Sequence, residues 1–249
     1  MFIGHAEKLQ IISVCIAAWV GVCSGSFLNV VVHRLPIMTE RRQRRAAGML
    51  AESSTQVEDP FNLAVPRSRC PTCGHQIRWF ENIPVLSYVA LGGRCSSCHT
   101  HISLRYPMVE VVTSTFFAFC IWRFGATPTG VAWCFFGAML LSLVLIDWDA
   151  NLSPDAMTMS LLGVGICASA LGITQLSVAD ALTGAVGGFL LFCMAFWAGR
   201  LTRTTAGLRA GDVKLMAAVG AWLGWQALGP LVLIKTLARA IRALSTHRN

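Results

Sequence analysis

The chain has 249 residues, of which 55% are hydrophobic and only 13% are charged. Together with a mean hydropathy of +0.60, this composition excludes an ordinary soluble domain and indicates a polytopic membrane protein. The net charge of +8 does not indicate a nucleic-acid partner, because ten of the 20 basic residues are arginines concentrated in the single stretch 34–106.

Six apolar segments follow one another along the chain, each of about 17–23 residues and long enough to cross a hydrocarbon core of about 30 Å. We expect helices over 11–33, 107–123, 130–146, 156–173, 179–199 and 213–234. The first is too long for a cleavable signal and has no small-residue cleavage site. The last contains Gly220, Gly224, Gly229 and Pro230, which favour a break into a short helix and a second start.

Charge divides the chain into regions and gives it an orientation. Because Lys and Arg gather in cytoplasmic loops, the N-terminus is expected outside and the arginine-rich loop inside. Within that loop, residues 37–66 are rich in Arg and then in Ser, Glu and Asp, which is typical of a mobile insert. The four expected regions are a first span (1–33), a cytoplasmic loop (34–106), a transmembrane core (107–234) and a basic tail (235–249).

Four of the ten cysteines form two C-x-x-C pairs in the loop. Cys70 with Cys73, and Cys95 with Cys98, offer thiolates from two tight turns that together complete a tetrahedral Zn²⁺ site. Such a site has no open coordination position, so we expect zinc to fold the loop rather than to catalyse. The second pair also matches a c-type haem attachment motif, which an arginine-rich cytoplasmic loop disfavours. The fold class is therefore an all-α polytopic membrane bundle of about six to seven spans with a cytoplasmic zinc-binding loop.

The other six cysteines are scattered through the apolar segments and are expected to be small buried side chains. They are Cys15, Cys23, Cys120, Cys134, Cys167 and Cys193. Glycines spaced four apart in the same segments are expected to let helices pack closely. These pairs are Gly21 with Gly25, Gly184 with Gly188, and Gly220 with Gly224.

Two aspartates stand at the edges of apolar segments. Asp147 ends one segment and Asp212 begins another, both on the cytoplasmic side in the orientation above. Acidic residues at a bilayer boundary are costly and are usually kept for a function. Two neighbouring carboxylates are not both ionised cheaply, so one holds a proton while the other activates a water molecule, as in an aspartic protease. We therefore predict Asp147 and Asp212 as a catalytic pair.

Neighbouring acids compete for the first of these roles. Asp149 lies two residues beyond Asp147, on a different face of a continuing helix. Asp155 follows Pro154 at a position where a carboxylate can cap the next helix. Asp180 falls on the opposite side of the membrane and is expected to be another cap.

Two residues flank Asp212. Lys214 is expected either to tune the charge of Asp212 or to be an interfacial lysine that reaches toward water. Gly211 permits close backbone approach to the site, although a simple turn would use it equally well.

These residues resemble a known family, the bacterial type IV prepilin leader peptidases, which are membrane aspartic proteases and N-methyltransferases. The segment GSFLNVVVHRLP at 25–36 is similar to the family's signature, as are both C-x-x-C pairs, ENIP at 81–84 and RYPMVE at 105–110. The segment 147–155 resembles the family's D-x6-LPD element, and 209–224 resembles GxGDxKLxAxxGAWLG. Ser153 replaces the usual leucine and Arg209 the first glycine, and after Pro230 the chain is short and basic where the family continues through further helices.

The resemblance implies an inner-membrane enzyme whose catalytic residues are Asp147 and Asp212. Its substrates would be prepilins or pseudopilins, whose basic leader is cut after glycine on the cytoplasmic side. It also implies S-adenosylmethionine as methyl donor to the new N-terminus. Glu81 and Asn82 are donor-site candidates by motif match, with structural roles in the zinc loop as the alternative. The expected partners are these substrates and the lipid bilayer, and no nucleic acid.

Two other classes of function stay open from the sequence. One is a catalytically impaired paralogue or a non-enzymatic zinc-loop membrane protein, which Arg209 and the basic tail would fit. The other is a transporter whose aspartates bind protons or cations, since acids within membranes also serve that role.

Overall fold

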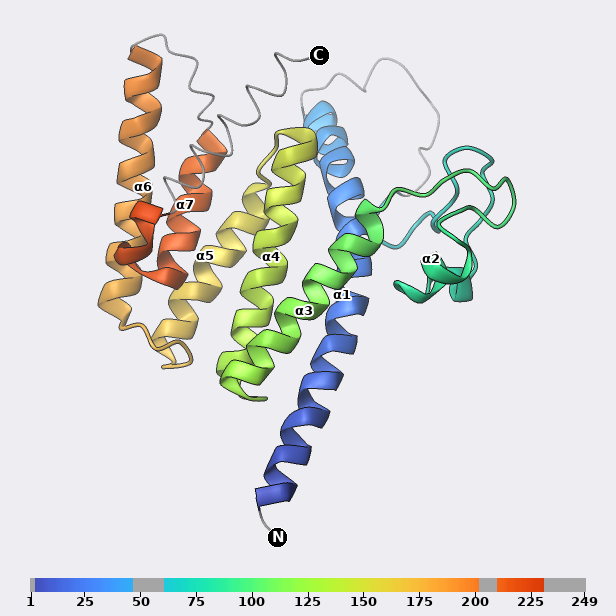
Figure 1. Ribbon diagram of the computed structural model, residues 1–249. Helices are drawn as coiled ribbons and strands as arrows, with labels where there is room; N and C mark the ends of the chain where they lie inside the picture. Colours follow the sequence, from blue (N-terminus) through green and yellow to red (C-terminus); the bar gives the residue numbers. More distant parts are fainter. Residues whose placement is uncertain (1–2, 47–60, 202–209, 231–249) are drawn as a thin grey trace. The chain divides into compact units, whose positions relative to one another are not determined.

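The computed structural model describes residues 3–46, 61–201 and 210–230 (Figure 1). Within these ranges every regular element is helical, and β-structure is limited to two isolated bridges in the cysteine loop. The predicted all-α class is confirmed. The elements are α1 (Ile3–Ala46), η1 (Trp79–Asn82), α2 (Leu86–Ala90), α3 (Arg105–Phe124), α4 (Pro128–Ala150), α5 (Asp155–Ala170), α6 (Val178–Leu201), α7 (Ala210–Leu223) and η2 (Trp225–Ala227).

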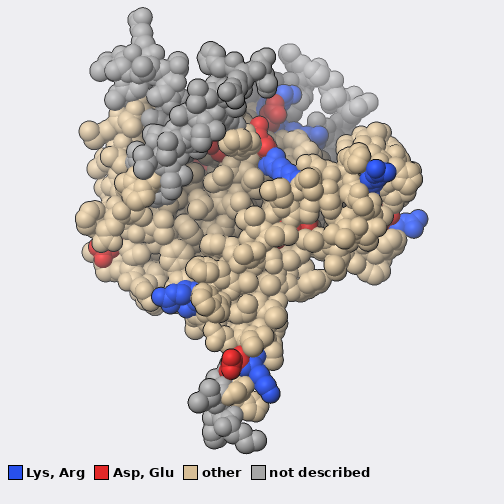
Figure 2. All heavy atoms as spheres, viewed as in Figure 1, with Lys and Arg blue, Asp and Glu red and all other residues tan. Residues whose placement is uncertain are grey.

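The long helices have the length and composition of membrane spans. Among the described residues, four helices are long and apolar enough to cross a bilayer, namely α1, α3, α4 and α6. The helix α5 is a shorter apolar helix. On the face shown in Figure 2, few charged side chains appear between the two ends of α3 and α4, as a hydrocarbon environment requires.

The first helix is longer than the sequence pattern predicted. It does not end near residue 33 but continues through Pro36 to Ala46, so the first part of the predicted mobile insert is helical. Residues after Pro36 are good helix formers, and Arg44 lies 2.6 Å from Glu40 in an i,i+4 ion pair. Because these residues are polar, hydropathy alone does not reveal the extension. Residues 47–60 of the predicted insert lie outside the described ranges.

The last predicted span is broken, as its glycines predicted. The helix α7 ends at Leu223, and Gly224 has φ +74°, a backbone conformation that L side chains rarely adopt. The short helix η2 follows at once. The part of this segment beyond residue 230, and the basic tail, lie outside the described residues.

Helix boundaries follow from local sequence. Thr127 caps α4, because its hydroxyl accepts a hydrogen bond from the Gly130 N–H at 3.3 Å, and Pro128 occupies the first helical position. Ser177 precedes α6, and its hydroxyl accepts from the Asp180 N–H at 3.1 Å and donates to the Asp180 carboxylate at 2.7 Å. Asp180 therefore takes part in a helix cap, in agreement with the sequence.

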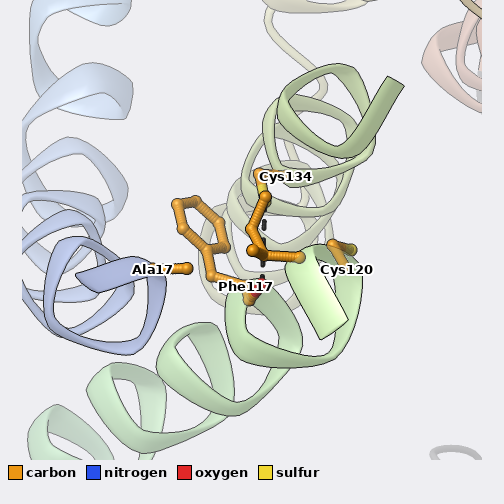
Figure 3. Packing of buried hydrophobic residues seen from close by; sticks show 5 residues of the cluster. Ala17, Phe117, Cys120 and Cys134 are labelled. Atoms are coloured by element: carbon orange, nitrogen blue, oxygen red, sulfur yellow. Dashed lines mark hydrogen bonds between the residues drawn. The ribbon is translucent and has the colours of Figure 1, made fainter. Parts of the chain in front are cut away.

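The chain divides into two compact units, Met1–Asn151 and Leu152–Asn249. In the first unit, α1, α3 and α4 pack around a core of Ala17, Phe117, Cys120, Ile121 and Cys134. Figure 3 shows Ala17, Phe117 and Cys134 pointing toward one another where the three helices meet. A Cβ atom on Gly21 would lie 2.7 Å from the Ser114 Cα, so this glycine allows α1 and α3 to approach closely, as predicted.

The span cysteines are only partly buried. Cys120 and Cys134 lie in the core, as predicted, and Cys193 is half-buried. Cys15, Cys23 and Cys167 are exposed on helix surfaces, which corrects the prediction for these three. A thiol is apolar enough to face lipid, so the sequence pattern does not separate core from lipid-facing positions.

In the second unit, α7 packs against α5 and α6. A Cβ atom on Gly220 would overlap the carbonyl oxygen of Gly184, so the backbones of α6 and α7 are in direct contact. Trp222 is fully buried, and its indole N–H donates to the Leu161 carbonyl of α5 at 2.8 Å. Buried Trp222 therefore fixes α7 to α5, while the glycines set its distance from α6.

Replacing Gly220 with alanine is expected to push α6 and α7 apart and to destabilise the protein by about 1–3 kcal/mol, the usual effect of overpacking. Thermal unfolding of the detergent-purified protein measures this loss. The matched control is Gly163→Ala in α5, where an added Cβ meets nothing within 4 Å. There, better helix propensity predicts an unchanged or higher Tm. Equal Tm values for the two variants would show that the close contact between α6 and α7 does not make Gly220 necessary for stability.

Candidate active site and metal centre

Asp147 lies in the last turn of α4, directly after the fully buried Ile146. The helix ends at Ala150, and its C-cap Asn151 takes the left-handed conformation and donates its N–H to the Asp147 carbonyl at 3.0 Å. The Asp147 side chain is half-buried. Within the described ranges, its carboxylate has no hydrogen-bond or ion-pair partner.

Asp149 has a different environment from Asp147, although it is only two residues away. Its carboxylate accepts a hydrogen bond from the Arg105 guanidinium of α3 at 2.7 Å. Both side chains are more than one-third exposed, so the pair contributes little to stability. The pair nevertheless neutralises Asp149 and joins the start of α3 to the end of α4.

Asp155 begins α5 in the second unit and is also paired. Lys214 of α7 lies 2.8 Å from its carboxylate. Pro154, not Asp155, is the N-cap residue, and the cap has no side-chain hydrogen bond. Asp155 is therefore not the capping residue that was predicted. As an acid in the first turn, it still interacts favourably with the helix dipole. Lys214 serves as the counter-ion of Asp155, a role that the sequence did not suggest.

Asp212 lies in the first turn of α7 and is only 2% exposed. Gly211, just before it, is where the chain passes close to the loop that precedes α5. A Cβ atom at Gly211 would lie 2.7 Å from the Ser153 Cβ. The structure thus shows a close approach at Gly211, and the residue it approaches is Ser153, which stands where the resembling family carries leucine.

The environments of the four acids separate them into two kinds. Asp149 and Asp155 are exposed carboxylates neutralised by Arg105 and Lys214. Asp147 and Asp212 are the two more enclosed carboxylates, one in each compact unit. Because perturbed carboxylates suited to proton transfer are typically enclosed, the difference in burial favours Asp147 and Asp212.

The two C-x-x-C pairs form two copies of one turn. The segments 69–77 and 94–102 read RCPTCGHQI and RCSSCHTHI, and each is closed by an isolated β-bridge. In each, the N–H of the first cysteine bonds to the carbonyl five residues later, at 2.9 Å and 3.0 Å. Gly74 and His99 occupy equivalent positions with positive φ. Such turns direct both thiols of a pair to one side.

The four thiols meet at one point, as their spacing predicted. The Sγ atoms of Cys70, Cys73, Cys95 and Cys98 all lie within 4.8 Å of one another. Cys70 is 3.8 Å from Cys98, and Cys73 is 4.0 Å from Cys95. A tetrahedral zinc ion with Zn–S bonds of about 2.3 Å separates its sulfur ligands by about 3.8 Å. The cluster therefore fits the geometry of a four-thiolate metal site with shifts of about 1 Å or less.

The surroundings of the thiols shift the pKa values of Cys98 and Cys73 in opposite directions. The Thr100 hydroxyl and N–H lower the pKa of the Cys98 thiol to about 6. At Cys73 the His75 N–H lowers the pKa, but burial and the three neighbouring thiols outweigh it and raise the pKa to about 11. Four thiols this close do not all ionise without a cation among them, which is the electrostatic role of a bound metal.

Glu81 is engaged inside the cysteine loop. Its carboxylate accepts from the Arg78 N–H at 2.9 Å and lies 3.3 Å from the His75 imidazole. The Arg78 N–H, the Ser96 hydroxyl and His75 together lower the pKa of Glu81. These contacts favour the structural alternative stated for Glu81. Asn82, the other donor-site candidate, is exposed.

The segment at 25–36 anchors the cysteine loop, a role that its sequence did not reveal. Arg34 is buried and donates to the carbonyls of Asn62 at 2.9 Å, Leu63 at 3.3 Å and Pro66 at 2.6 Å. Asn29 donates to the Tyr106 carbonyl at 3.1 Å, where the loop rejoins the membrane. A buried arginine at the end of an apolar helix is a sign of such an anchor, because a charge there needs partners.

Replacing Arg34 with lysine should free the start of the loop, because an ammonium group does not reach three carbonyls in a fixed fork. We expect a loss of about 1–3 kcal/mol and faster tryptic cleavage at Arg67 and Arg69. The matched control is Arg44→Lys, which retains an exposed i,i+4 ion pair on the same helix and should leave cleavage unchanged. Equal cleavage rates for both variants would contradict the anchoring role.

Comparisons with known proteins cover nearly all of these elements. A family model for the bacterial peptidase A24 N-terminal domain matches residues 19–124, and one for the type IV leader peptidase family matches residues 134–244. Among solved structures, none matches the chain.

Curated relatives match over most of their length. The prepilin leader peptidase/N-methyltransferase of Burkholderia pseudomallei strain 1026b is 44% identical over 231 residues, covering 88% of this chain and 72% of the relative. The protein of the same name from Pseudomonas aeruginosa is 44% identical over 89% of this chain and 76% of the relative. That from Aeromonas salmonicida strain A449 is 44% identical over 87% and 75%. On these matches, the chain belongs to the type IV leader peptidase family, as its motifs predicted.

Proposed function

We propose that this protein is a prepilin leader peptidase that cleaves the basic leader of type IV prepilins or pseudopilins with Asp147 and Asp212. Family membership and the names of its relatives support the reaction and the substrate class. The observation that supports this choice of residues is how deeply each acid is buried. Asp149 and Asp155 have cationic partners, whereas Asp147 and Asp212 are the more enclosed carboxylates.

The chemistry requires the two carboxylates to share one water molecule in the working enzyme. One ionised carboxylate takes a proton from the water, whose oxygen attacks the scissile carbonyl carbon. The other, protonated carboxyl donates a hydrogen bond to the oxygen that gains negative charge. A proton then passes to the leaving amine as the peptide bond breaks. This route forms no covalent intermediate with the enzyme.

Zinc would fold the cysteine loop. Cys70, Cys73, Cys95 and Cys98 would hold one Zn²⁺, and their convergence within 4.8 Å supports this assignment. With four protein ligands the ion has no open position for substrate, so it supplies a cross-link between the two turns rather than a reactive water.

The four membrane-span candidates together with the family indicate an inner-membrane protein. We place the loop and both aspartates on the cytoplasmic side. This orientation rests on the ten arginines of residues 34–106, which positive-inside topology assigns to the cytoplasm.

We also assign an N-methyltransferase activity that uses S-adenosylmethionine. The names of its relatives support it. A methyl group would be transferred to the amine that cleavage releases, so the peptidase reaction must come first. Within the loop, Glu81 is held by Arg78 and His75 and is assigned a structural role.

Purified protein incubated with a prepilin tests both activities. Leader removal is followed by gel mobility, and methylation by mass spectrometry of the new N-terminus with and without S-adenosylmethionine. Cleavage without the methyl donor, and methylation only after cleavage, are the expected results. An unprocessed prepilin would contradict the peptidase, and a cleaved but unmethylated product would contradict only the second activity.

A further inference from the structure

The short helix α2 presents its apolar side outward. Leu86 and Val89 lie on one face, and their side chains are 59% and 71% exposed. The opposite side faces the loop, because the Tyr88 hydroxyl donates to the Ile102 carbonyl at 3.2 Å. Just before α2, Trp79 is 82% exposed and packs edge-to-face against Phe80. An exposed apolar surface of this kind marks an interaction site.

A buried carboxylate fixes the depth of this surface beside the membrane helix α3. Glu110 is only 7% exposed, and its carboxylate accepts from the Val85 N–H, at the start of α2, at 2.7 Å. Glu110 lies five residues beyond Arg105, which pairs with Asp149 at the polar end of α3 and α4. Five helical residues correspond to about 7.5 Å along the axis. In Figure 1 the loop folds back toward the membrane helices, so that α2 lies beside the first turns of α3 rather than beyond them.

This depth matches a lipid interface. Interfacial helices bury their apolar face about 5–10 Å into the boundary between headgroups and acyl chains. Leu104 and Met108, where α3 begins, are also exposed apolar residues. Tryptophan is typical of this boundary layer.

The charge of the loop complements an anionic bilayer. Among the described residues 61–104, four arginines are exposed: Arg67, Arg69, Arg78 and Arg94. The acidic residue of this range, Glu81, is largely buried and is bound within the loop by Arg78 and His75. A positive surface beside an outward-facing apolar helix is typical of peripheral contact with acidic phospholipids.

We propose that residues 79–90 form a second, peripheral membrane contact, in which Trp79, Leu86 and Val89 insert into the interface of an anionic bilayer beside α3. Glu110 sets the depth of this contact through the Val85 N–H. The contact holds the cysteine loop against the membrane surface, where a substrate with a membrane-embedded helix and a basic leader would emerge. It depends on the membrane assignment of α3 and not on the proposed peptidase activity.

Site-specific fluorescence in vesicles tests this contact without any substrate. A fluorescent amino acid is encoded in the full-length protein at Val89, at Leu86 or, as a matched control in the same loop, at Arg67. The proteins are reconstituted in phosphatidylcholine–phosphatidylglycerol vesicles. Quenching is measured with lipids that carry a nitroxide just below the headgroup, and separately with iodide in the water.

The labels at Val89 and Leu86 are expected to lose most of their fluorescence to the nitroxide lipids and little to iodide, with the reverse at Arg67. Iodide quenching at both Val89 and Leu86 would overturn the proposal, since the surface would then face water. Protection from both quenchers would also overturn it, because the surface would then pack against protein. Because no substrate is present, a second copy of the chain would be the occupant in that case.

Discussion

Asparagine in place of Asp212 is expected to lower the rate of leader cleavage by at least about 10²–10⁴-fold, the usual contribution of an acid–base group. The side chain is 2% exposed, and asparagine matches it in size, so packing at the start of α7 should be kept. An amide neither takes nor returns the proton that water activation requires. Single-turnover cleavage of a purified prepilin measures the chemical step directly.

Asp155→Asn is the matched control in the same unit. Its carboxylate is exposed and paired with Lys214, so its loss should change cleavage by a small factor only. Unfolding temperatures of both variants should stay close to that of the parent protein. Normal cleavage by Asp212→Asn in a folded protein would remove Asp212 from the catalytic pair.

Serine in place of Cys70 is expected to reduce bound zinc from one ion per chain to a trace. Cys70 is buried at the point where the two turns meet, and a serine hydroxyl does not replace a thiolate ligand. Because apparent binding energies of structural zinc are about 10–16 kcal/mol, the loop should then lose its order. Elemental analysis of the purified protein gives the metal content, and trypsin reports loop order through cleavage at the exposed arginines.

Cys23→Ser supplies the comparison for the metal experiment. Cys23 is an exposed thiol on α1, outside the four-cysteine cluster, and its loss should leave zinc content and tryptic cleavage unchanged. Full zinc content in Cys70→Ser would show that the four thiols do not form the metal site. Zinc loss in both variants would point to general misfolding instead.

Features that depend on local sequence were predicted well. Apolar runs located all six apolar helices, α1 and α3 to α7, to within a few residues at most ends, because burial in lipid and helix length are both visible in hydropathy. The convergence of the four thiols was predictable although Cys70 and Cys98 are 28 positions apart, because two C-x-x-C pairs have the spacing of a four-thiolate metal site. The break at Gly224 was predictable because a glycine permits the positive φ that ends α7.

Features that depend on long-range pairing were not predictable. Arg105 meets Asp149 across 44 positions and Lys214 meets Asp155 across 59, and nothing in the sequence selects these partners from other charges. The same holds for Arg34, whose three acceptors are backbone carbonyls and carry no side-chain signal. These pairings neutralise Asp149 and Asp155, which are also more exposed than the two proposed catalytic acids.

The glycines of the second unit connect its fold to the proposed chemistry. Gly220 sets the contact of α7 with α6, and Gly211 lets the start of α7 approach Ser153 closely. Asp212 lies between these two contacts, so its position depends on two places where no side chain fits. A small change in either glycine should therefore affect catalysis as well as stability.

Two neighbouring substitutions on α4 give the most direct test of the catalytic assignment. Asp147→Asn should abolish cleavage of a prepilin leader in single-turnover assays, whereas Asp149→Asn, which only breaks an exposed pair with Arg105, should keep most of it. Both variants lie on the same helix and lose the same charge, so effects of lost charge or of a perturbed α4 should be similar in the two and do not explain a difference in cleavage. Full cleavage by Asp147→Asn together with its loss in Asp149→Asn would contradict the assignment of Asp147.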